Sequence, residues 1–336
     1  MTSNRSLRRA VTLVDLLVML AMIALMMTLS LCSGQRSRET ANRAKCLSNL
    51  KMIGTACRVY ETANNGQYPR AIYKPVRADE PYTVTWGTPY TGPDDAKPSD
   101  KADTFGRNKD ATVDGANPPE DNDVTASLFL LVRTCDMPAE VFVCPSTKQK
   151  PFDFGTKAAG RNIFSTAWTN WPGKTGIAQH LSYGVHNMYP NVNAVAIGFA
   201  WNSSRLTSEF AIAGDMSPGG NDLLKITVNS PAREMRKGNS LNHAGEGENV
   251  LYGDGHADWS STPFNGVNRD NIYTARTAEA VNEPSAGGDP KKVVLVGSPV
   301  GPDDSILLPH ASDVGATVRV ATRSSPTVAM PRRCRR

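Results

Sequence analysis

The stretch "NHAGEGENVLYGDGHADW", residues 242–259, decides the fold of this 336-residue chain. An apolar run at 250–252 leads into Asp254-Gly255, a dipeptide typical of tight β-hairpin turns, and the chain then returns through "HADW". His243 stands before a glycine-rich segment that lets the backbone turn sharply. We therefore predict a hairpin that brings His243 close to Asp254 and His256.

Further short β-type runs surround this hairpin. They are "VFVC" at 141–144, "LSYGV" at 181–185, "FAIA" at 210–213, "NVLY" at 249–252 and "VVLV" at 293–296. Helical periodicity is found in this part of the chain only over 126–133. We predict an α+β protein in which a mostly antiparallel β-sheet domain follows one long N-terminal helix. Asp215 and His186 are further polar residues at strand ends.

Three roles remain open for His243, Asp254, Gly255, His256 and Asp215. The dipeptide can simply make the turn while the histidines hydrogen-bond to backbone. Imidazole and carboxylate groups can bind a divalent metal, with His243, Asp254 and His256 as candidate ligands. A hydrolase would also need a nucleophile, and no Ser or Cys lies in a nucleophile-elbow context. We favour the structural role and expect no enzymatic activity and no cofactor, with a bound divalent metal as the alternative.

The N-terminus carries "RRAVTLVDLLVMLAMIALMMTLSLCS", residues 8–33, in which the 21 residues from 11 to 31 hold a single ionisable side chain, Asp15. A helix needs about 20 apolar residues to cross a bilayer. The arginines upstream favour a cytoplasmic N-terminus. We therefore predict a transmembrane helix at 11–31, with the bulk of the chain on the far side of the membrane.

The carboxylate of Asp15 calls for a partner, because a charge at mid-membrane costs about 2.5–3.5 kcal/mol. Cleavage after Ala10 would make Asp15 the fifth residue and would place a new amino terminus one helical turn away. After the span, apolar residues at three- and four-residue spacing predict an amphipathic stalk helix that ends at Asn64-Asn65-Gly66.

Charge and cysteine usage narrow the function classes. The net charge is +5, and arginines concentrate at the two ends of the chain, so the body offers no basic groove for nucleic acid. The six cysteines contain no C-x-x-C pair, which gives no support for a closed zinc site. Cys135 and Cys144 bracket a short apolar segment. They are a disulfide candidate if the body is exported, and two free thiols fit the sequence equally well.

The N-terminal segment resembles the class III prepilin signal of type IV pilins and type II secretion pseudopilins. The hairpin segment resembles the C-terminal signature of bacterial prepilin-like proteins named for an H-X9-DG motif, with ten residues rather than nine between His243 and Asp254. Four further blocks look like family segments in the expected order: "CLSNLKMIGTACRVYETANNGQYP", "VFVCPST", "LSYGVHN" and "FAIAGDMSP".

This resemblance implies that a prepilin peptidase cuts between Ala10 and Val11 and methylates Val11, and that Asp15 takes the place of the usual glutamate. It implies a single-pass protein of the bacterial inner membrane, with a cytoplasmic N-terminus and a periplasmic or extracytoplasmic C-terminal domain. The partners would be other pilin or pseudopilin subunits, packed through the N-terminal helix in a type II secretion or pilus-like system. Two other functions stay open: a membrane-tethered module that binds a glycan or metal without polymerising, and an exported hydrolase built on His243 and Asp254.

The expected organisation follows from these segments. It consists of a prepilin leader at 1–10, the transmembrane helix at 11–31, the stalk helix at 32–65, a polar loop-rich insertion at 66–125, a β-rich head at 126–275, and a C-terminal extension with a disordered basic tail at 276–336. A faint calcium-loop pattern within the insertion is better explained as a solvated loop, since prolines interrupt it.

Overall fold

The structure is a computed structural model, and it describes residues 13–75, 84–87, 119–153, 170–171, 173–277, 280 and 292–314, except for the side chains of 27–35. The chain divides into two compact units, Met1–Asn42 and Arg43–Arg336. Of the predicted segments, the leader, most of the insertion and the basic tail lie outside the described residues.

The first unit contains the beginning of helix α1 (Leu13–Ala63). From Leu13 to Met26 its side chains are exposed, and all are apolar except Asp15, which lies in the first turn. Within the described part of the chain, no helix is both long and apolar enough to cross a membrane. The predicted transmembrane helix at 11–31 and the single-pass inner-membrane location are therefore wrong. A helix that crosses a bilayer needs about 20 predominantly apolar residues.

The second unit begins within α1, where the predicted amphipathic stripe is confirmed. Leu50, Ile53 and Cys57 are buried, because the three- and four-residue spacing puts them on the face that packs against the body. The helix ends where the sequence predicts, with Asn65 at φ 54° and Gly66 at φ 77°. Both residues tolerate this left-handed conformation, which ends the helix.

The remaining elements of the second unit are short. The helices are α2 (Val124–Thr134), η1 (Ala139–Phe142), α3 (Gly173–His180), α4 (Val192–Ala196), α5 (Ala232–Met235), η2 (Leu241–His243) and η3 (Val267–Arg269). The strands are β1 (Tyr183–His186), β2 (Ala211–Asp215), β3 (Glu248–Tyr252), β4 (Ala257–Ser260), β5 (Ala275–Arg276), β6 (Val293–Val294) and β7 (Leu307–Leu308).

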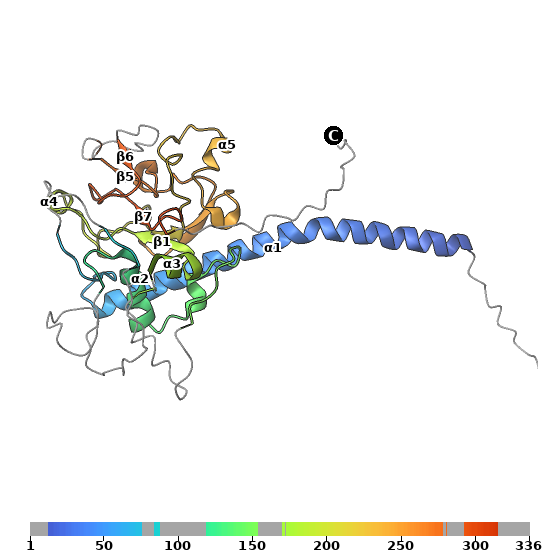
Figure 1. Cartoon of the computed structure of the whole chain (residues 1–336), viewed down its shortest axis with the longest axis horizontal. Coiled ribbons are helices and arrows are strands. Elements are labelled where there is room, and N and C mark those ends of the chain that lie inside the picture. Colours follow the sequence, from blue (N-terminus) through green and yellow to red (C-terminus); the bar gives the residue numbers. More distant parts are fainter. Residues whose placement is uncertain are drawn as a thin grey trace, which may run out of the picture. The chain divides into compact units, whose positions relative to one another are not determined.

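Five strands form an antiparallel sheet in the order β4-β3-β2-β1-β7, and β5 pairs with β6 separately. The sheet has a core on each face, because successive side chains of a strand point to opposite sides. Leu251 and Leu308 join the core that contains α1 and α2, whereas Val250 and Leu307 join the core that contains α5. In Figure 1, α2 lies on one side of strand β1 and α5 on the other. The α+β class and the antiparallel sheet are thus confirmed.

The predicted hairpin is also confirmed. Strand β3 pairs with β4 from Glu248↔Ser260 to Leu251↔Ala257. In the turn, the Gly255 N–H donates to the Tyr252 carbonyl at 2.9 Å, and Gly255 has φ 92°. Helix α1 packs close to this hairpin at Gly54, where an added Cβ would lie 2.8 Å from Leu251 Cδ1.

One expectation about the β-rich part needs correction. Residues 141–144 are not a strand, because Pro138 starts a 3₁₀ turn in which the Val141 N–H donates to the Pro138 carbonyl at 3.1 Å. The region after residue 275 contributes the strands β6 and β7. Its strand β7 forms an edge of the central sheet by pairing with β1, so the head continues to at least residue 308.

Candidate functional site

The structure brings together two of the polar residues that the sequence singled out. Asp215 is the last residue of β2 and His243 the last residue of η2, and both side chains are fully buried. His243 Nε2 lies 3.4 Å from Asp215 Oδ2. The two residues meet because η2 leads directly into β3, the strand that pairs with β2.

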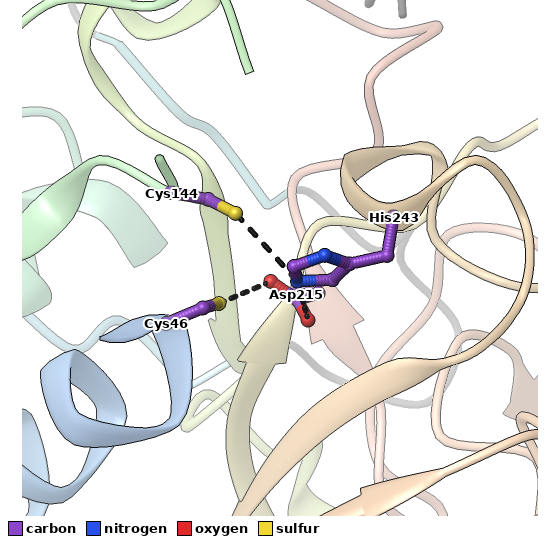
Figure 2. A group of neighbouring side chains, drawn as sticks. All are labelled: Cys46, Cys144, Asp215 and His243. Atoms are coloured by element: carbon purple, nitrogen blue, oxygen red, sulfur yellow. Dashed lines mark hydrogen bonds and ion pairs between the residues drawn. The ribbon is translucent and has the colours of Figure 1, made fainter. Parts of the chain in front are cut away.

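Two cysteines that sequence reasoning did not assign to the site complete the group (Figure 2). Cys46 comes from α1 and donates through Sγ to Asp215 Oδ1 at 3.0 Å. Cys144 follows η1, and its Sγ lies 3.6 Å from His243 Nε2. The four donor atoms lie within 4.8 Å of one another. Both cysteines stand in quoted family-like blocks, "CLSNL" and "VFVCPST", but nothing in their wide sequence separation indicates that they meet.

Local backbone chemistry fixes the position of His243. Ser240 caps η2 by accepting the Asn242 N–H at 3.2 Å, and its hydroxyl donates to the Met216 carbonyl at 2.7 Å. Ala244, with φ 60°, and Gly245, with φ 71°, then turn the chain toward β3. The glycine-rich segment thus makes the turn that the sequence predicts.

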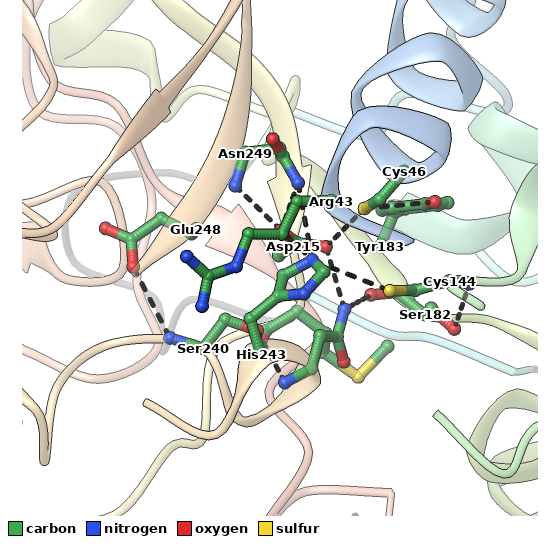
Figure 3. Close-up of polar contacts among 12 residues, drawn as sticks. Arg43, Cys46, Cys144, Ser182, Tyr183, Asp215, Ser240, His243, Glu248 and Asn249 are labelled. Carbon is green, nitrogen blue, oxygen red and sulfur yellow. Dashed lines mark hydrogen bonds and ion pairs between the residues drawn. The ribbon is translucent and has the colours of Figure 1, made fainter. Parts of the chain in front are cut away.

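Amide groups hold the Asp215 carboxylate in place (Figure 3). Oδ1 accepts from Asn242 Nδ2 at 2.9 Å, and Oδ2 accepts from the backbone N–H of Asn249 at 2.7 Å and from its Nδ2 at 3.1 Å. The thiol of Cys46 is also oriented, because the Tyr183 hydroxyl donates to its Sγ at 3.4 Å. These contacts therefore fix the orientation of the Asp215 carboxylate.

Burial and the contacts within the cluster have opposite effects on the pKa values of His243 and Asp215. Burial lowers the pKa of His243, but hydrogen bonds to Asp215 and Cys144 outweigh it and raise that pKa to about 11. Burial also works against the Asp215 carboxylate, yet the contact with His243 lowers its pKa below the usual range. An imidazolium and a carboxylate thus form a buried ion pair.

The two thiols differ although they share one site. Burial raises the pKa of the Cys46 thiol well above its ordinary value, and the neighbouring Cys144 adds to this shift. The hydrogen bond from Cys46 lowers the pKa of the Cys144 thiol, in spite of burial, and His243 lowers it further. Cys144 is therefore the more readily ionised of the pair.

A further carboxyl group lies next to the site on β3. Glu248 is fully buried, and burial raises its pKa well above the usual range. It accepts from the Ser240 N–H at 3.4 Å and from Asn265 Nδ2 at 3.2 Å. This side chain therefore supports the segment that carries His243 through its hydrogen bonds.

The expected grouping of His243 with Asp254 and His256 is wrong. Asp254 and His256 lie in the turn after β3, whereas His243 precedes the strand, so the length of β3 separates them. Their side chains are 45% and 41% exposed, and His256 Nδ1 lies 2.5 Å from Asp254 Oδ1. Gly255 takes part only in the turn. His186 is elsewhere again, stacked on Trp201 with ring centroids 5.1 Å apart.

The disulfide candidate is also corrected. Cys135 and Cys144 are both free thiols. Cys144 faces Cys46 and His243, whereas Cys135 caps α2 and its Sγ donates to the Ala56 carbonyl at 3.6 Å. The processing residues Ala10 and Val11 lie outside the described residues, and Asp15 lies in the exposed first turn of α1.

The geometry limits what this cluster can do chemically. In a Cys-His-Asp triad the acid holds one ring nitrogen while the thiol uses the other. Here Asp215 Oδ2 and Cys144 Sγ approach the same nitrogen, Nε2 of His243. All four side chains are also closed off from solvent. The arrangement suits a structural ion pair or a metal ligand set better than a nucleophilic centre.

Comparison of the chain with protein-family models, with curated proteins and with solved structures finds no match.

Proposed function

We propose that this chain is a structural, non-enzymatic subunit of the pseudopilin type, which assembles with other subunits by packing of the first part of α1. The observation that carries the proposal is the exposure of that helix. Its large apolar side chains are between 48% and 75% exposed: Leu13, Val14, Leu16, Leu17, Val18, Met19, Leu20, Met22, Ile23, Leu25 and Met26.

These side chains occupy all positions from Leu13 to Met26 except 15, 21 and 24, and therefore surround the helix on all sides. A helix that is apolar all round is stable only where other apolar groups cover it. A bundle of like helices from neighbouring subunits supplies such cover, and this is the mode of assembly that the prepilin-like sequence implies. Type II secretion and pilus-like assemblies are the systems in which we place the protein.

Asp15 supports the same proposal. It is the only ionisable residue from Leu13 to Met26 and lies in the first turn of α1, where a carboxylate is favoured by the helix dipole. Cleavage after Ala10 by a prepilin peptidase would give Val11 a charged amino terminus one turn before Asp15. Such a terminus, in the same chain or in a neighbour, is the natural partner of this carboxylate.

Assembly is tested with one charge placed at two matched positions of α1. Leu20 and Val59 are each 55% exposed, but only Leu20 lies in the apolar segment. In sedimentation velocity of the full chain, Leu20→Glu should convert assemblies to monomers, whereas Val59→Glu should leave them intact. A wild-type chain that is monomeric at all concentrations would refute assembly and favour a non-polymerising binding module.

Processing is tested separately by mass spectrometry of the N-terminus after co-expression with a prepilin peptidase. The expected product begins with N-methylated Val11. Asp15→Ala should still be cut but should assemble poorly. An intact N-terminus, or a cut at another bond, would contradict the prepilin assignment.

A further inference from the structure

We infer that Cys46, Cys144, Asp215 and His243 form a four-ligand site for a divalent metal ion of borderline softness, with zinc as the expected occupant. This site is independent of the assembly proposed above. The four residues come from α1, the segment after η1, the end of β2 and η2, which are far apart in the sequence. Between 0% and 1% of each residue is exposed.

Three contacts between the donor groups lie near the spacing of tetrahedral coordination, and Figure 2 shows the four side chains converging. Bond lengths of about 2.0–2.3 Å to zinc give donor-to-donor separations of roughly 3.3–3.8 Å in a tetrahedron. The Cys144 Sγ–His243 Nε2 distance is 3.6 Å and the His243 Nε2–Asp215 Oδ2 distance is 3.4 Å. The Cys46 Sγ–Asp215 Oδ1 distance is 3.0 Å, which is below this range and is made to the other carboxylate oxygen, so coordination through one oxygen needs a small shift of Cys46 or Asp215.

The direction of the groups supports a shared central ion. Thiol, carboxylate and imidazole all point toward one another, and two of them approach the same ring nitrogen. A cation at the centre would displace the thiol protons of Cys46 and Cys144 and the proton at His243 Nε2, and would take over the contacts that these protons make. The same convergence is what excludes a triad.

The surroundings orient the ligands as a metal site requires. Amide donors from Asn242 and Asn249 fix the Asp215 carboxylate, and the backbone N–H of Cys144 donates to Ser182 Oγ at 2.9 Å. Trp259 packs edge-on against the His243 ring, with centroids 5.3 Å apart. Arg43 lies 4.2 Å from the centroid of Trp259 and pairs with Glu246, which closes this side of the site.

The ligand types select the metal class. Two sulfurs, one imidazole and one carboxylate favour zinc over calcium or magnesium, which prefer all-oxygen sites. Four protein ligands in a closed interior are typical of a structural rather than a catalytic zinc site. The ion would join α1 to three segments of the sheet domain, so its expected role is to stabilise the second unit.

The test is metal analysis of the full chain purified in reductant. We expect about one zinc ion per chain and at least about a tenfold loss of zinc affinity in Cys46→Ser and Cys144→Ser. Cys57→Ser is the matched control, because Cys57 is a buried cysteine of the same helix outside the cluster. Equal zinc content in all four proteins would overturn the proposal.

A second measurement covers variants that fail to fold. Chelator-treated wild-type chain is titrated with Co²⁺ alone, and the expected result is a thiolate-to-cobalt absorption band together with intense visible bands of tetrahedral cobalt. Absence of both in reduced, folded protein would refute the site. A peptide linking Cys46 to Cys144, found in chain purified without reductant while the reduced chain binds no metal, would replace the metal site by a redox pair. Neither readout depends on assembly.

Discussion

Asp215, the last residue of β2, and His243, the last residue of η2, lie near the beginning of β3. Asp254 and His256 lie in the turn that follows the other end of β3. The first pair is fully buried at 3.4 Å, and the second is almost half exposed at 2.5 Å. We expect the shorter contact, between Asp254 and His256, to contribute less to stability, because water screens exposed charges. Distance alone therefore does not identify the pair that matters.

The surroundings make the difference. Asp215 accepts hydrogen bonds from four groups on three other segments, namely Cys46, Asn242 and two nitrogens of Asn249. Asp254 contacts mainly its near neighbour His256, through the ring and the backbone N–H. The buried pair thus ties distant elements together, whereas the turn pair is local.

The largest effect is expected for Asp215→Ala. It leaves the buried His243 ring charged without its partner and removes the acceptor of Asn242, Asn249 and Cys46. Such a loss costs about 3–5 kcal/mol of unfolding free energy. Urea unfolding of the full chain, followed by tryptophan fluorescence with chelator and reductant present, measures it without any contribution from bound metal.

Asp258→Ala is the matched control for this substitution. Asp258 is an exposed carboxylate on β4 of the same hairpin, and its loss should change the unfolding free energy by less than about 0.5 kcal/mol. If the two variants were destabilised equally, or Asp215→Ala by less than about 1 kcal/mol, the buried cluster would not stabilise the packing of distant elements.

A second buried histidine shows what burial does without an acidic partner. His186 is fully buried among Trp201, Phe199 and Phe210, and burial lowers its pKa to about 3. Below about pH 6.5 the unfolded chain takes up a proton that the folded chain refuses, so unfolding becomes easier as pH falls. The expected loss from this group is about 2 kcal/mol at pH 5 relative to pH 8.

His186→Asn tests this effect, because Asn Oδ1 can accept the Ile306 N–H that Nδ1 accepts at 3.3 Å. The variant is destabilised at pH 8 by the lost ring packing. The difference from wild type should then shrink by about 2 kcal/mol between pH 8 and pH 5, as measured by urea unfolding. A difference that stays constant over this range would mean that His186 is protonated in the folded chain.

The sequence predicts the frame of this molecule better than its site. The hairpin, the strands at 181–185 and 210–213 and the end of α1 follow from local turn chemistry and periodicity, and all are confirmed. The length and apolar composition of residues 11–31 predict a membrane span, and the structure contradicts it.

The site depends on tertiary contacts that no local pattern specifies. His243, Asp254 and His256 are close in the sequence, and on that ground we predict that they lie together. Strand β3 stands between them, and an extended strand keeps the residues at its two ends apart. Cys46 and Cys144 reach His243 and Asp215 only because α1 and the segment after η1 pack against the sheet. The sequence points to His243 and Asp215 as polar site residues and to Cys144 only as a disulfide candidate.

Gly255 tests whether the turn itself, rather than its charges, stabilises the hairpin. Its φ of 92° is unfavourable for other residues, and an added Cβ would meet no atom within 4 Å, so the cost of a side chain is backbone strain alone. Gly255→Ala should lower the unfolding free energy by about 1–2 kcal/mol. Gly255→Asn should cost less, because asparagine tolerates this region better. Equal losses in urea unfolding would contradict a strain origin.

The smallest effect is expected for the exposed pair. In a double-mutant cycle of Asp254→Ala and His256→Ala, the coupling energy at pH 6 should be below about 1 kcal/mol. Raising the ionic strength from about 0.05 M to about 0.5 M should reduce it further, because salt screens exposed charges. The ring of His256 also stacks on Tyr252, with centroids 4.4 Å apart, so His256→Ala alone loses packing that the cycle subtracts. A coupling above about 2 kcal/mol that is insensitive to salt would place the turn pair beside the buried pair and end the distinction between them.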